Sequence, residues 1–543
     1  MLRQIRDDDI VHYIAIELCN PTAATGFLDF KNRFGKGTLK YFLIITLIIC
    51  LSISSLFLAS CTIEEVESLL NSGKTPEKTG EETFSQVQDS DNDTDTDHDK
   101  KDLLSSGTEA NDNTGSQNTI PEPENNLMFL SSEANFAFVY SHKDLALSSY
   151  PAQPGDYGDM SLSVSITGLE MLEGDTRDKA LDEREALENG DFGPDTDFSF
   201  EPSREVVERN GINVKEFLVF GRYNVCDVAF DRKAVFYNNG YQVQITLCAD
   251  KETITESMGQ YFTYDEINCR EEIVWDHELQ DEFYEKLVSK QAASPALDWY
   301  KTFDEIMYLL QINEFKGASA GYSRVIDKRY YEVSEDDNYI IDISYPQFQS
   351  AVAAGLDDSI NKIIYKDIIL SNMDAFKAEI AAYDYENDIS NYLLSIAYRV
   401  VTYNENGISL CLDIYPYLGG AHGMTYFETI NFDLNNNKLI GLEDLFEQGY
   451  GYLEVISGYC RRDLKEQMDK QGWQPDEQWI EEGTDPGNTD TLTNFLVAPS
   501  GLIVKFPAYQ VAPYAAGDFS VLIPYGQFEG HVNPDSMIAQ YVR

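Results

Sequence analysis

Residues 234–247 read AVFYNNGYQVQITL and carry the clearest folding signal of the chain. Asn238, Asn239 and Gly240 separate two runs of β-forming residues, and Asn-Gly pairs suit the positive φ angles of a tight hairpin turn. From residue 241 to 247, apolar and polar residues alternate. This alternation gives a strand one dry and one wet face, so the sequence predicts an antiparallel sheet that is covered on one side.

Similar patterns extend over residues 128–315, which we expect to form one α+β domain. Residues 280–290 and 299–310 are predicted to be helices, and the acidic stretch 173–197 is predicted to be a long loop. We recognise no family in this part, and it contains no motif that indicates catalysis or metal binding. Further strands are predicted at residues 136–140, 162–166 and 217–220.

Residues 328–543 are predicted to form a second α+β domain. Apolar residues at spacings of four, four and three predict a helix after its first strand. These residues are Val352, Leu356, Ile360 and Ile363. An Asn-Gly pair at 406–407 predicts a hairpin between the strands 391–403 and 408–417. Further strands are expected at 339–345, 424–434, 502–506 and 519–524, and a helix at 452–468. Helices beside largely antiparallel strands define the α+β class.

The first 60 residues predict export from the cell. Residues 41–60 contain no charged residue and follow Lys36 and Lys40, as in a signal peptide with a basic edge. The run ends in the letters LASC, which look like a bacterial lipobox in which Cys61 accepts a diacylglycerol. We therefore expect residues 1–60 to be an N-terminal extension and lipoprotein signal peptide. Cys61 would then anchor the mature protein in the lipid bilayer, on the extracytoplasmic face of the cell membrane.

Other interpretations of this region stay open. An apolar run of about 20 residues is also long enough for an uncleaved transmembrane helix. Residues 1–40 indicate either a start site assigned too far upstream or a short cytoplasmic segment. Residues 61–127 are acidic and rich in Ser, Thr, Asp and Asn, with little apolar periodicity, which predicts a disordered linker.

Charge and motifs narrow the classes of function. The 543 residues carry a formal net charge of -53, which disfavours nucleic acids as partners because these need basic surface. The sequence contains no CxxC, HExxH, GxSxG or P-loop, so we expect no metal, no cofactor and no enzymatic activity.

Cys411 lies in an apolar strand and is predicted to be a buried free thiol, with a bridge to Cys460 as the alternative.

One loop is the candidate ligand-binding site. It contains Gly419, Gly420, His422 and Gly423 between two predicted strands. Glycines there allow positive φ and close approach of the backbone. In the functional interpretation the loop presents His422 to a ligand. In the structural interpretation it is a tight connection whose histidine bonds to its own backbone.

Three motifs give residues 328–543 a resemblance to a known family. They are YLGGAHG at 417–423, NFDL at 431–434 followed by LEDLF at 442–446, and YQVAPYAAG at 509–517 followed by VLIPY at 521–525. In this order and spacing they resemble the RsiV-like extracytoplasmic domain. That domain forms the ectodomain of lysozyme-sensing anti-sigma factors, and it stands beside the catalytic domain of some peptidoglycan deacetylases.

The resemblance implies a non-catalytic domain that binds a ligand. Lysozyme, which is strongly basic, and peptidoglycan are the ligands it suggests. We expect a membrane-anchored surface lipoprotein whose ectodomain binds a cationic protein or a cell-wall component. The alternatives are a peptidoglycan-modifying enzyme or its accessory module, and an anti-sigma-type receptor with residues 1–40 in the cytoplasm.

Overall fold

The computed structural model of the protein describes part of the chain between residues 126 and 542. The described residues are 126–141, 143, 145–150, 160–192, 204–222, 228–249, 262–265, 272–275, 277–313, 321–334, 338–351, 355, 358–382, 392–488 and 490–542. The predicted signal segment, Cys61 and almost all of the predicted linker lie outside them. Within these ranges, no helix is both long enough and apolar enough to cross a membrane.

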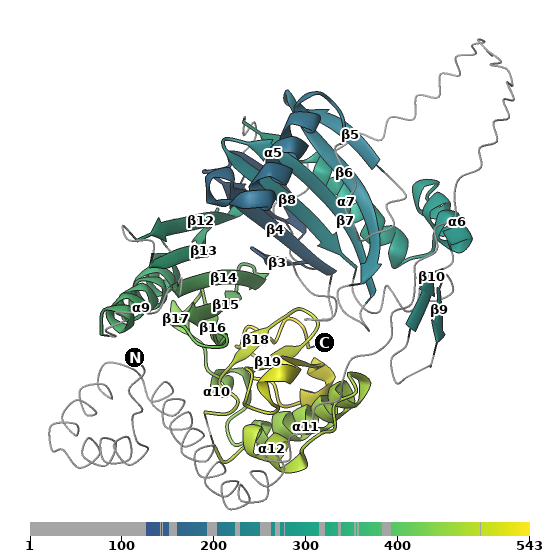
Figure 1. Ribbon diagram of the computed structural model, residues 1–543. Helices are drawn as coiled ribbons and strands as arrows, with labels where there is room; N and C mark the ends of the chain where they lie inside the picture. The colour runs from purple at the N-terminus through teal and green to yellow at the C-terminus, as the bar shows by residue number, and fades with distance from the viewer. Residues whose placement is uncertain are drawn as a thin grey trace, which may run out of the picture. The chain divides into compact units, whose positions relative to one another are not determined.

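The described strands build one large mixed sheet of 15 strands (Figure 1). The strand order is β11-β2-β1-β12-β13-β14-β3-β4-β8-β7-β6-β5. Outside this series, β15 pairs with β14, β16 with β15 and β17 with β16. The pairs β1–β12, β13–β14 and β3–β4 are parallel, and the other described neighbours are antiparallel. This architecture confirms the α+β class with largely antiparallel sheets.

The strands of this sheet have the following bounds: β1 Asn126–Ser131, β2 Phe136–Ser141, β3 Leu145–Ser148, β4 Met160–Gly168, β5 Arg204–Arg209, β6 Ile212–Arg222, β7 Val228–Asn238, β8 Tyr241–Cys248, β11 Gln311–Ile312, β12 Ser323–Val333, β13 Tyr339–Gln349, β14 Tyr392–Tyr403, β15 Gly407–Tyr417, β16 Tyr426–Asp433 and β17 Lys438–Leu439. Strands β9 Phe262–Asp265 and β10 Glu272–Trp275 pair separately.

The hairpin predicted from residues 234–247 is confirmed. Strands β7 and β8 pair antiparallel up to Asn238 and Tyr241, and the turn between them has positive φ at Asn239 (49°) and Gly240 (83°). On β8 the side chains of Val243 and Ile245 are fully buried in the core of the sheet, as the alternation predicted. The turn residues set the register, and the apolar face sets the side that is covered.

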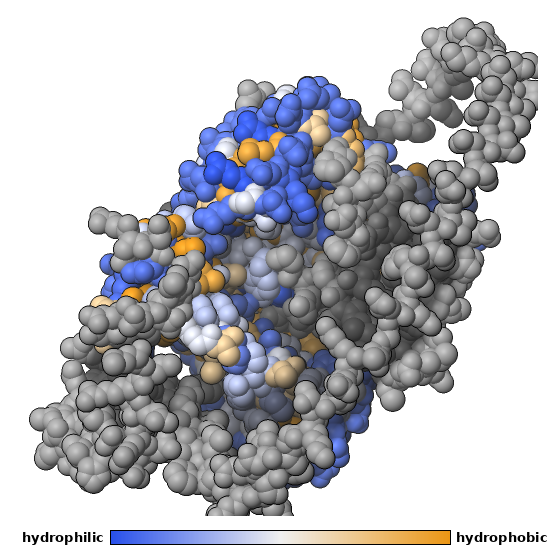
Figure 2. All heavy atoms as spheres, in the orientation of Figure 1, coloured by the Kyte–Doolittle hydropathy of each residue, from blue (hydrophilic) through white to orange (hydrophobic). Residues whose placement is uncertain are grey.

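The prediction of a loop over residues 173–197 is wrong, because residues Gly174–Glu188 form helix α5. Its buried residues are only Ala180 and Leu187, so the apolar stripe that marks a packed helix is almost missing from the sequence. Figure 2 shows mainly hydrophilic side chains over this part of the molecule. Polar contacts to the sheet hold the helix: Glu183 pairs with the buried Lys215 of β6 at 2.8 Å.

The sheet continues across the predicted boundary between residues 315 and 328. Strand β1 pairs with β12, with Leu127 opposite Ser323 and Ser131 opposite Asp327. Strand β3 pairs with β14 through Ser148 opposite Arg399. The division into domains at 128–315 and 328–543 stays a prediction, and strands from both sides of it are hydrogen-bonded in one sheet.

Helices cover the large sheet. Trp299 of α7 is fully buried and donates a hydrogen bond from its Nε1 to the carbonyl of Leu247 at 3.2 Å, which fixes α7 on β8. The helix predicted from Val352 is described from Asp358 onward, because Val352 and Leu356 lie outside the described residues. Ile360 of this helix is fully buried, as expected. The helical elements here are α6 His277–Val288, α7 Ala296–Tyr308, α8 Asp358–Lys362, the π-helical segment η6 Ile363–Leu370 and α9 Ser371–Ala382.

A second, three-stranded sheet follows near the C-terminus, in the order β18-β19-β20. It forms its own core with α11 and docks on the large sheet, where Thr402 of β14 donates to the carbonyl of Val497 at 2.7 Å. The elements are α10 Leu442–Leu445, α11 Tyr452–Lys470, α12 Glu477–Gly483, β18 Phe495–Val497, β19 Leu502–Phe506, the 3₁₀ turn η7 Tyr514–Ala516, β20 Phe519–Ile523 and the 3₁₀ turn η8 Tyr525–Phe528.

Candidate ligand-binding surface

The loop between β15 and β16 depends on its glycines. Gly419 and Gly420 have φ angles of 89° and 91°, in the region that side chains other than glycine rarely adopt. Gly423 is needed for a different reason, because a Cβ there would lie 2.5 Å from the Tyr415 ring and 2.8 Å from the carbonyl oxygen of Pro416. The three glycines therefore fix a tight path that carries His422 at its end.

His422 is exposed, and its ring is held by the loop. The carbonyl of Gly423 lies 2.9 Å from Nδ1, and because a carbonyl only accepts, Nδ1 carries the proton in this contact. In the neutral ring Nε2 is then the acceptor. This bond is the kind that the tight-connection interpretation expects. The exposure of the ring is what the ligand-presenting interpretation requires.

A second loop, after β19, contains an aromatic residue, Tyr509, whose backbone conformation is strained. Tyr509 has a φ of 71° and is 37% exposed. Its amide donates to the carbonyl of Ala512 at 3.0 Å, and its carbonyl accepts from Nε1 of Trp479 at 3.0 Å. A bulky residue with positive φ costs about 1–3 kcal/mol, and such strain clusters at functional sites. The surrounding hydrogen bonds compensate that cost and hold the exposed ring in place.

The two loops meet through ring contacts. The ring centroids of His422 and Tyr514 are 3.8 Å apart with an interplanar angle of 15°, and those of Tyr509 and Tyr514 are 5.7 Å apart. The Tyr514 hydroxyl also donates to the Gly423 carbonyl at 3.1 Å. Burial, followed by the neighbouring Tyr415 and Tyr509, raises the pKa of Tyr514, so this hydroxyl stays a donor at neutral pH.

We call the set Tyr417, His422, Tyr509 and Tyr514 the aromatic surface. Tyr417 belongs to it because its hydroxyl donates to the carbonyl of Gly420 at 3.0 Å, which braces the loop. Ring faces of this kind stack on apolar ligand faces and attract cations. Among the described residues, no cluster of His, Cys, Asp and Glu is arranged to hold a metal ion. The surface thus offers stacking and hydrogen bonding.

Of the four residues of this surface, the sequence identified only His422 as a candidate site residue. Gly419, Gly420, His422 and Gly423 were candidate site residues because they are neighbours in the sequence. Tyr509 and Tyr514 lie about 90 residues further on and entered only as letters of a motif. The signal that could have found them is that motif, YQVAPYAAG, whose Pro and Gly indicate a turn that places two tyrosines close together.

The described cysteines carry no part of the surface. Cys411 and Cys460 are buried and form no disulfide, which confirms the prediction for Cys411 and excludes its bridge to Cys460 in this structure. The Cys411 thiol donates to Oδ1 of Asp413 at 3.3 Å, and burial is the main cause that raises its pKa. A thiol that stays protonated is a poor nucleophile, so Cys411 acts as a small core residue.

Two family models match adjacent stretches of the chain. Residues 332–425 match the family described as Deacetylase PdaC, and residues 443–526 match the family described as a protein of unknown function, DUF3298. Each match covers less than half of the chain. His422 lies in the first matched stretch, and Tyr509 and Tyr514 lie in the second. The aromatic surface therefore joins the two stretches.

Comparison with known proteins gives one curated relative of note. The chain is similar to the peptidoglycan-N-acetylmuramic acid deacetylase PdaC of Bacillus subtilis (strain 168), with 25% identity over 191 residues. The match covers 35% of this chain and 38% of the relative, so the chain spans well under half of that protein's length. The peptidoglycan deacetylase part of the predicted resemblance is thereby confirmed, and its RsiV-specific part stays a prediction.

Two solved structures of DUF3298 family proteins show limited similarity to the chain. A DUF3298 family member from Bacteroides fragilis has 19% identity and a TM-score of 0.31, covering 40% of this chain and 96% of that one. A DUF3298 family protein from Pseudomonas aeruginosa has 15% identity and a TM-score of 0.29, covering 39% of this chain and 94% of that one.

Proposed function

We propose that this chain is a membrane-anchored, extracytoplasmic surface protein that binds a cell-wall component through the aromatic surface and catalyses no reaction. The observation that carries the proposal is the stack of His422 on Tyr514. It joins the stretch similar to a peptidoglycan deacetylase to the stretch similar to DUF3298. A ligand that contacts this surface would contact both stretches at once.

The chemistry of the surface supports a sugar as the ligand. A pyranose ring has a face of C–H groups and a rim of hydroxyls, which fits aromatic faces beside hydrogen-bonding groups. His422 offers Nε2 as an acceptor, while Tyr509 offers an exposed ring face. The curated relative is named for its action on peptidoglycan, whose strands are built of sugars.

Binding without catalysis fits the residues at the surface. One histidine and three tyrosines provide stacking faces and hydrogen-bonding groups, whereas acid–base catalysis of sugar chemistry commonly uses a pair of carboxylates. In the proposal the ectodomain is held at the membrane by the lipid on Cys61. The deacetylase activity in the relative's name is not transferred to this chain.

A cationic protein is the second candidate ligand, and the net charge of -53 favours it. Opposite charge accelerates the encounter of an acidic protein with a basic one such as lysozyme, and salt screens that attraction. Retention of lysozyme binding at about 0.5 M salt would therefore indicate a specific contact rather than general attraction.

The test compares the two ligands with one set of variants. Full-length protein is incubated with purified peptidoglycan or with immobilised lysozyme, at low salt and at about 0.5 M salt. The proposal expects salt-resistant binding to peptidoglycan that His422→Ala and Tyr514→Ala weaken. His531→Ala is the matched control, because His531 is also exposed and stacks on Tyr450 at 4.2 Å. Salt-resistant binding to lysozyme in place of peptidoglycan would favour the second candidate.

A further inference from the structure

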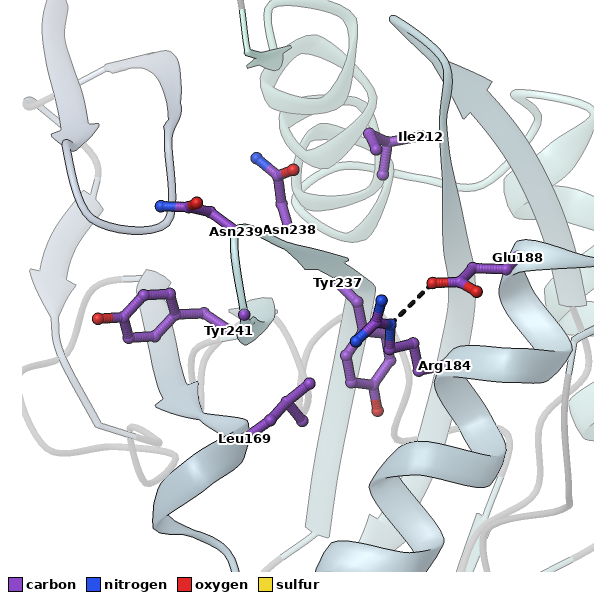
Figure 3. Close-up of a pocket in the computed structure, with 9 residues that line it drawn as sticks. Leu169, Arg184, Glu188, Ile212, Tyr237, Asn238, Asn239 and Tyr241 are labelled. Atoms are coloured by element: carbon purple, nitrogen blue, oxygen red, sulfur yellow. Dashed lines mark hydrogen bonds and ion pairs between the residues drawn. The ribbon is translucent and has the colours of Figure 1, made fainter.

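A pocket of about 190 Å³ lies in the N-terminal half of the described chain, among elements that neither matched family covers. Helix α5 contributes Arg184 and Glu188 to its lining, and the β7–β8 hairpin contributes Tyr237, Asn238 and Tyr241. Figure 3 shows these side chains around the pocket, with the guanidinium of Arg184 directed toward Glu188. The pocket is smaller than the roughly 300–1,000 Å³ typical for drug-sized ligands, so it suits a single ring.

The helical wall of the pocket is held rigidly against the sheet. Glu183 of α5 accepts hydrogen bonds from the Tyr237 hydroxyl at 2.6 Å and from Lys215 Nζ at 2.8 Å. Lys215 is only 1% exposed, so this ion pair is shielded from water and from salt. Burial, followed by the bond to Glu183, raises the pKa of Tyr237, and its hydroxyl remains a donor to Glu183 at neutral pH.

The hairpin wall is fixed by neighbouring turns. The side-chain Nδ2 of Asn238 donates hydrogen bonds to the carbonyl of Ala134 at 3.0 Å and to Oδ1 of Asn313 at 3.0 Å. Asn239 donates from its side chain to the carbonyl of Glu133. The turn is thereby tied to the β1–β2 connection and to the residue after β11. Walls that are set before binding reduce the ordering cost that a small ligand must overcome.

The lining selects the chemical class of the ligand. Arg184 and Glu188 form an ion pair at 2.7 Å, so the charged groups of the lining sum to zero. A phosphate site needs excess positive charge, and a metal site needs several carboxylate or imidazole ligands, whereas this lining holds one carboxylate. Two tyrosine rings, Leu169 and Ile212 supply apolar walls, and two asparagines and the ion pair supply hydrogen-bonding groups. This combination fits a neutral ring that carries hydroxyl groups.

We propose that the pocket between α5 and the β7–β8 hairpin binds a single neutral sugar ring. Tyr241 is the apolar wall against the C–H face of the ring, and Arg184 and Glu188 bond to its hydroxyls as donor and acceptor. This site is distinct from the aromatic surface, and the proposal does not rest on the function proposed for that surface.

Ligand-observed NMR on the full-length protein tests the proposal, with N-acetylglucosamine as the neutral probe and glucuronate and glucosamine as charged probes. Saturation should pass to the ring protons of N-acetylglucosamine and less to those of either charged sugar. Tyr241→Ala and Arg184→Met should each weaken the affinity by about tenfold. Arg184 is 44% exposed, so its substitution leaves the core intact.

Two controls decide between outcomes. Tyr308→Ala removes a tyrosine that is 61% exposed on α7 and should leave the affinity unchanged. His422→Ala is the comparison variant, because it reports on sugar that binds at the aromatic surface and not on the pocket. Affinity that survives both Tyr241→Ala and Arg184→Met overturns the proposal. So does affinity that is lost in His422→Ala and kept in the pocket variants, because the sugar would then bind only at the aromatic surface.

Discussion

The imidazole ring of His422 stacks on the phenol ring of Tyr514, with their centroids 3.8 Å apart. The two residues are separated by 92 positions in the sequence and come from different loops, one before β16 and one before β20. Their planes are 15° apart, and the Tyr514 hydroxyl bonds to the residue that follows His422. The contact gives the pair one defined face.

The first prediction concerns that face. His422→Ala should lower salt-resistant ligand binding by about tenfold, because it removes one stacking ring and the Nε2 acceptor. Isothermal titration calorimetry at about 0.5 M salt measures the change. His531→Ala should leave the affinity unaltered. An equal loss in both variants would mean that neither stack is specific to the ligand.

A second prediction concerns the glycines of the same loop. Gly423→Ala should lower the free energy of unfolding by about 2 kcal/mol, because the new Cβ overlaps the Tyr415 ring and a backbone carbonyl. Gly420→Ala has open space but a φ of 91°, and it should cost about 1 kcal/mol through strain. Urea titration measures both values.

The control for these variants is Gly458→Ala in α11, where an added Cβ meets nothing within 4 Å. It should raise the free energy of unfolding by about 0.5 kcal/mol, because alanine has the higher helix propensity. If Gly423→Ala proved as stable as the parent, the loop path described for residues 419–423 would be wrong.

A third prediction concerns stability in acid. Hydrogen bonds from Lys377 above all, and then from Tyr330 and Tyr339, lower the pKa of Glu332 to about 2 from its usual 4.5. A lowered folded-state pKa stabilises the fold above pH 4.5, and this contribution disappears as the pH falls toward 2. Glu332→Gln should therefore destabilise the protein by about 1 kcal/mol at neutral pH.

Thermal melts of Glu332→Gln and the parent at several pH values check this dependence. The difference between them should shrink between pH 4.5 and 2. Glu379→Gln, an exposed residue on the helix that carries Lys377, serves as the matched control and should follow the parent. A pH-independent difference for Glu332→Gln would show that the carboxylate does not act through its charge.

A fourth prediction concerns the anchor. Cys61→Ala should leave an unprocessed precursor of higher mass, since Cys61 is the residue placed to accept the lipid. Mass spectrometry of the N-terminus and incorporation of radiolabelled lipid measure the result. Processing and lipid incorporation that survive the substitution would remove the lipoprotein interpretation, whereas a parent chain that is itself never cleaved would favour an uncleaved transmembrane helix.

The fifth prediction concerns the division of the chain. A fragment of residues 328–543 should unfold cooperatively, because it holds its own strands, helices and a second core. It lacks β1, β3 and the first part of β12, so it should melt below residues 126–543. Calorimetry compares the two fragments. A broad, non-cooperative transition for the shorter one would mean that the cut passes through a single domain.

Local signals in the sequence sufficed for much of the fold. The turn at Asn239 and Gly240, the alternation along β8 and the Asn-Gly hairpin between β14 and β15 were predicted correctly, since each depends on φ preferences and on apolar periodicity within a few residues. Helix α5 was missed because its contact with the sheet is polar. The ion pair between Glu183 and Lys215 joins residues that are 32 positions apart, and the apolar periodicity of the sequence does not indicate it.

For the candidate site, the sequence by itself determined the loop that carries Gly419, Gly420, His422 and Gly423, because a run of glycines between strands limits the backbone path. Tertiary structure decided which aromatic side chains this loop meets. The stack on Tyr514 depends on how β19 and β20 dock against β14, β15 and β16, which is a packing relation between distant segments. Local patterns encode turns and faces, whereas contacts between loops arise only once the sheets are assembled.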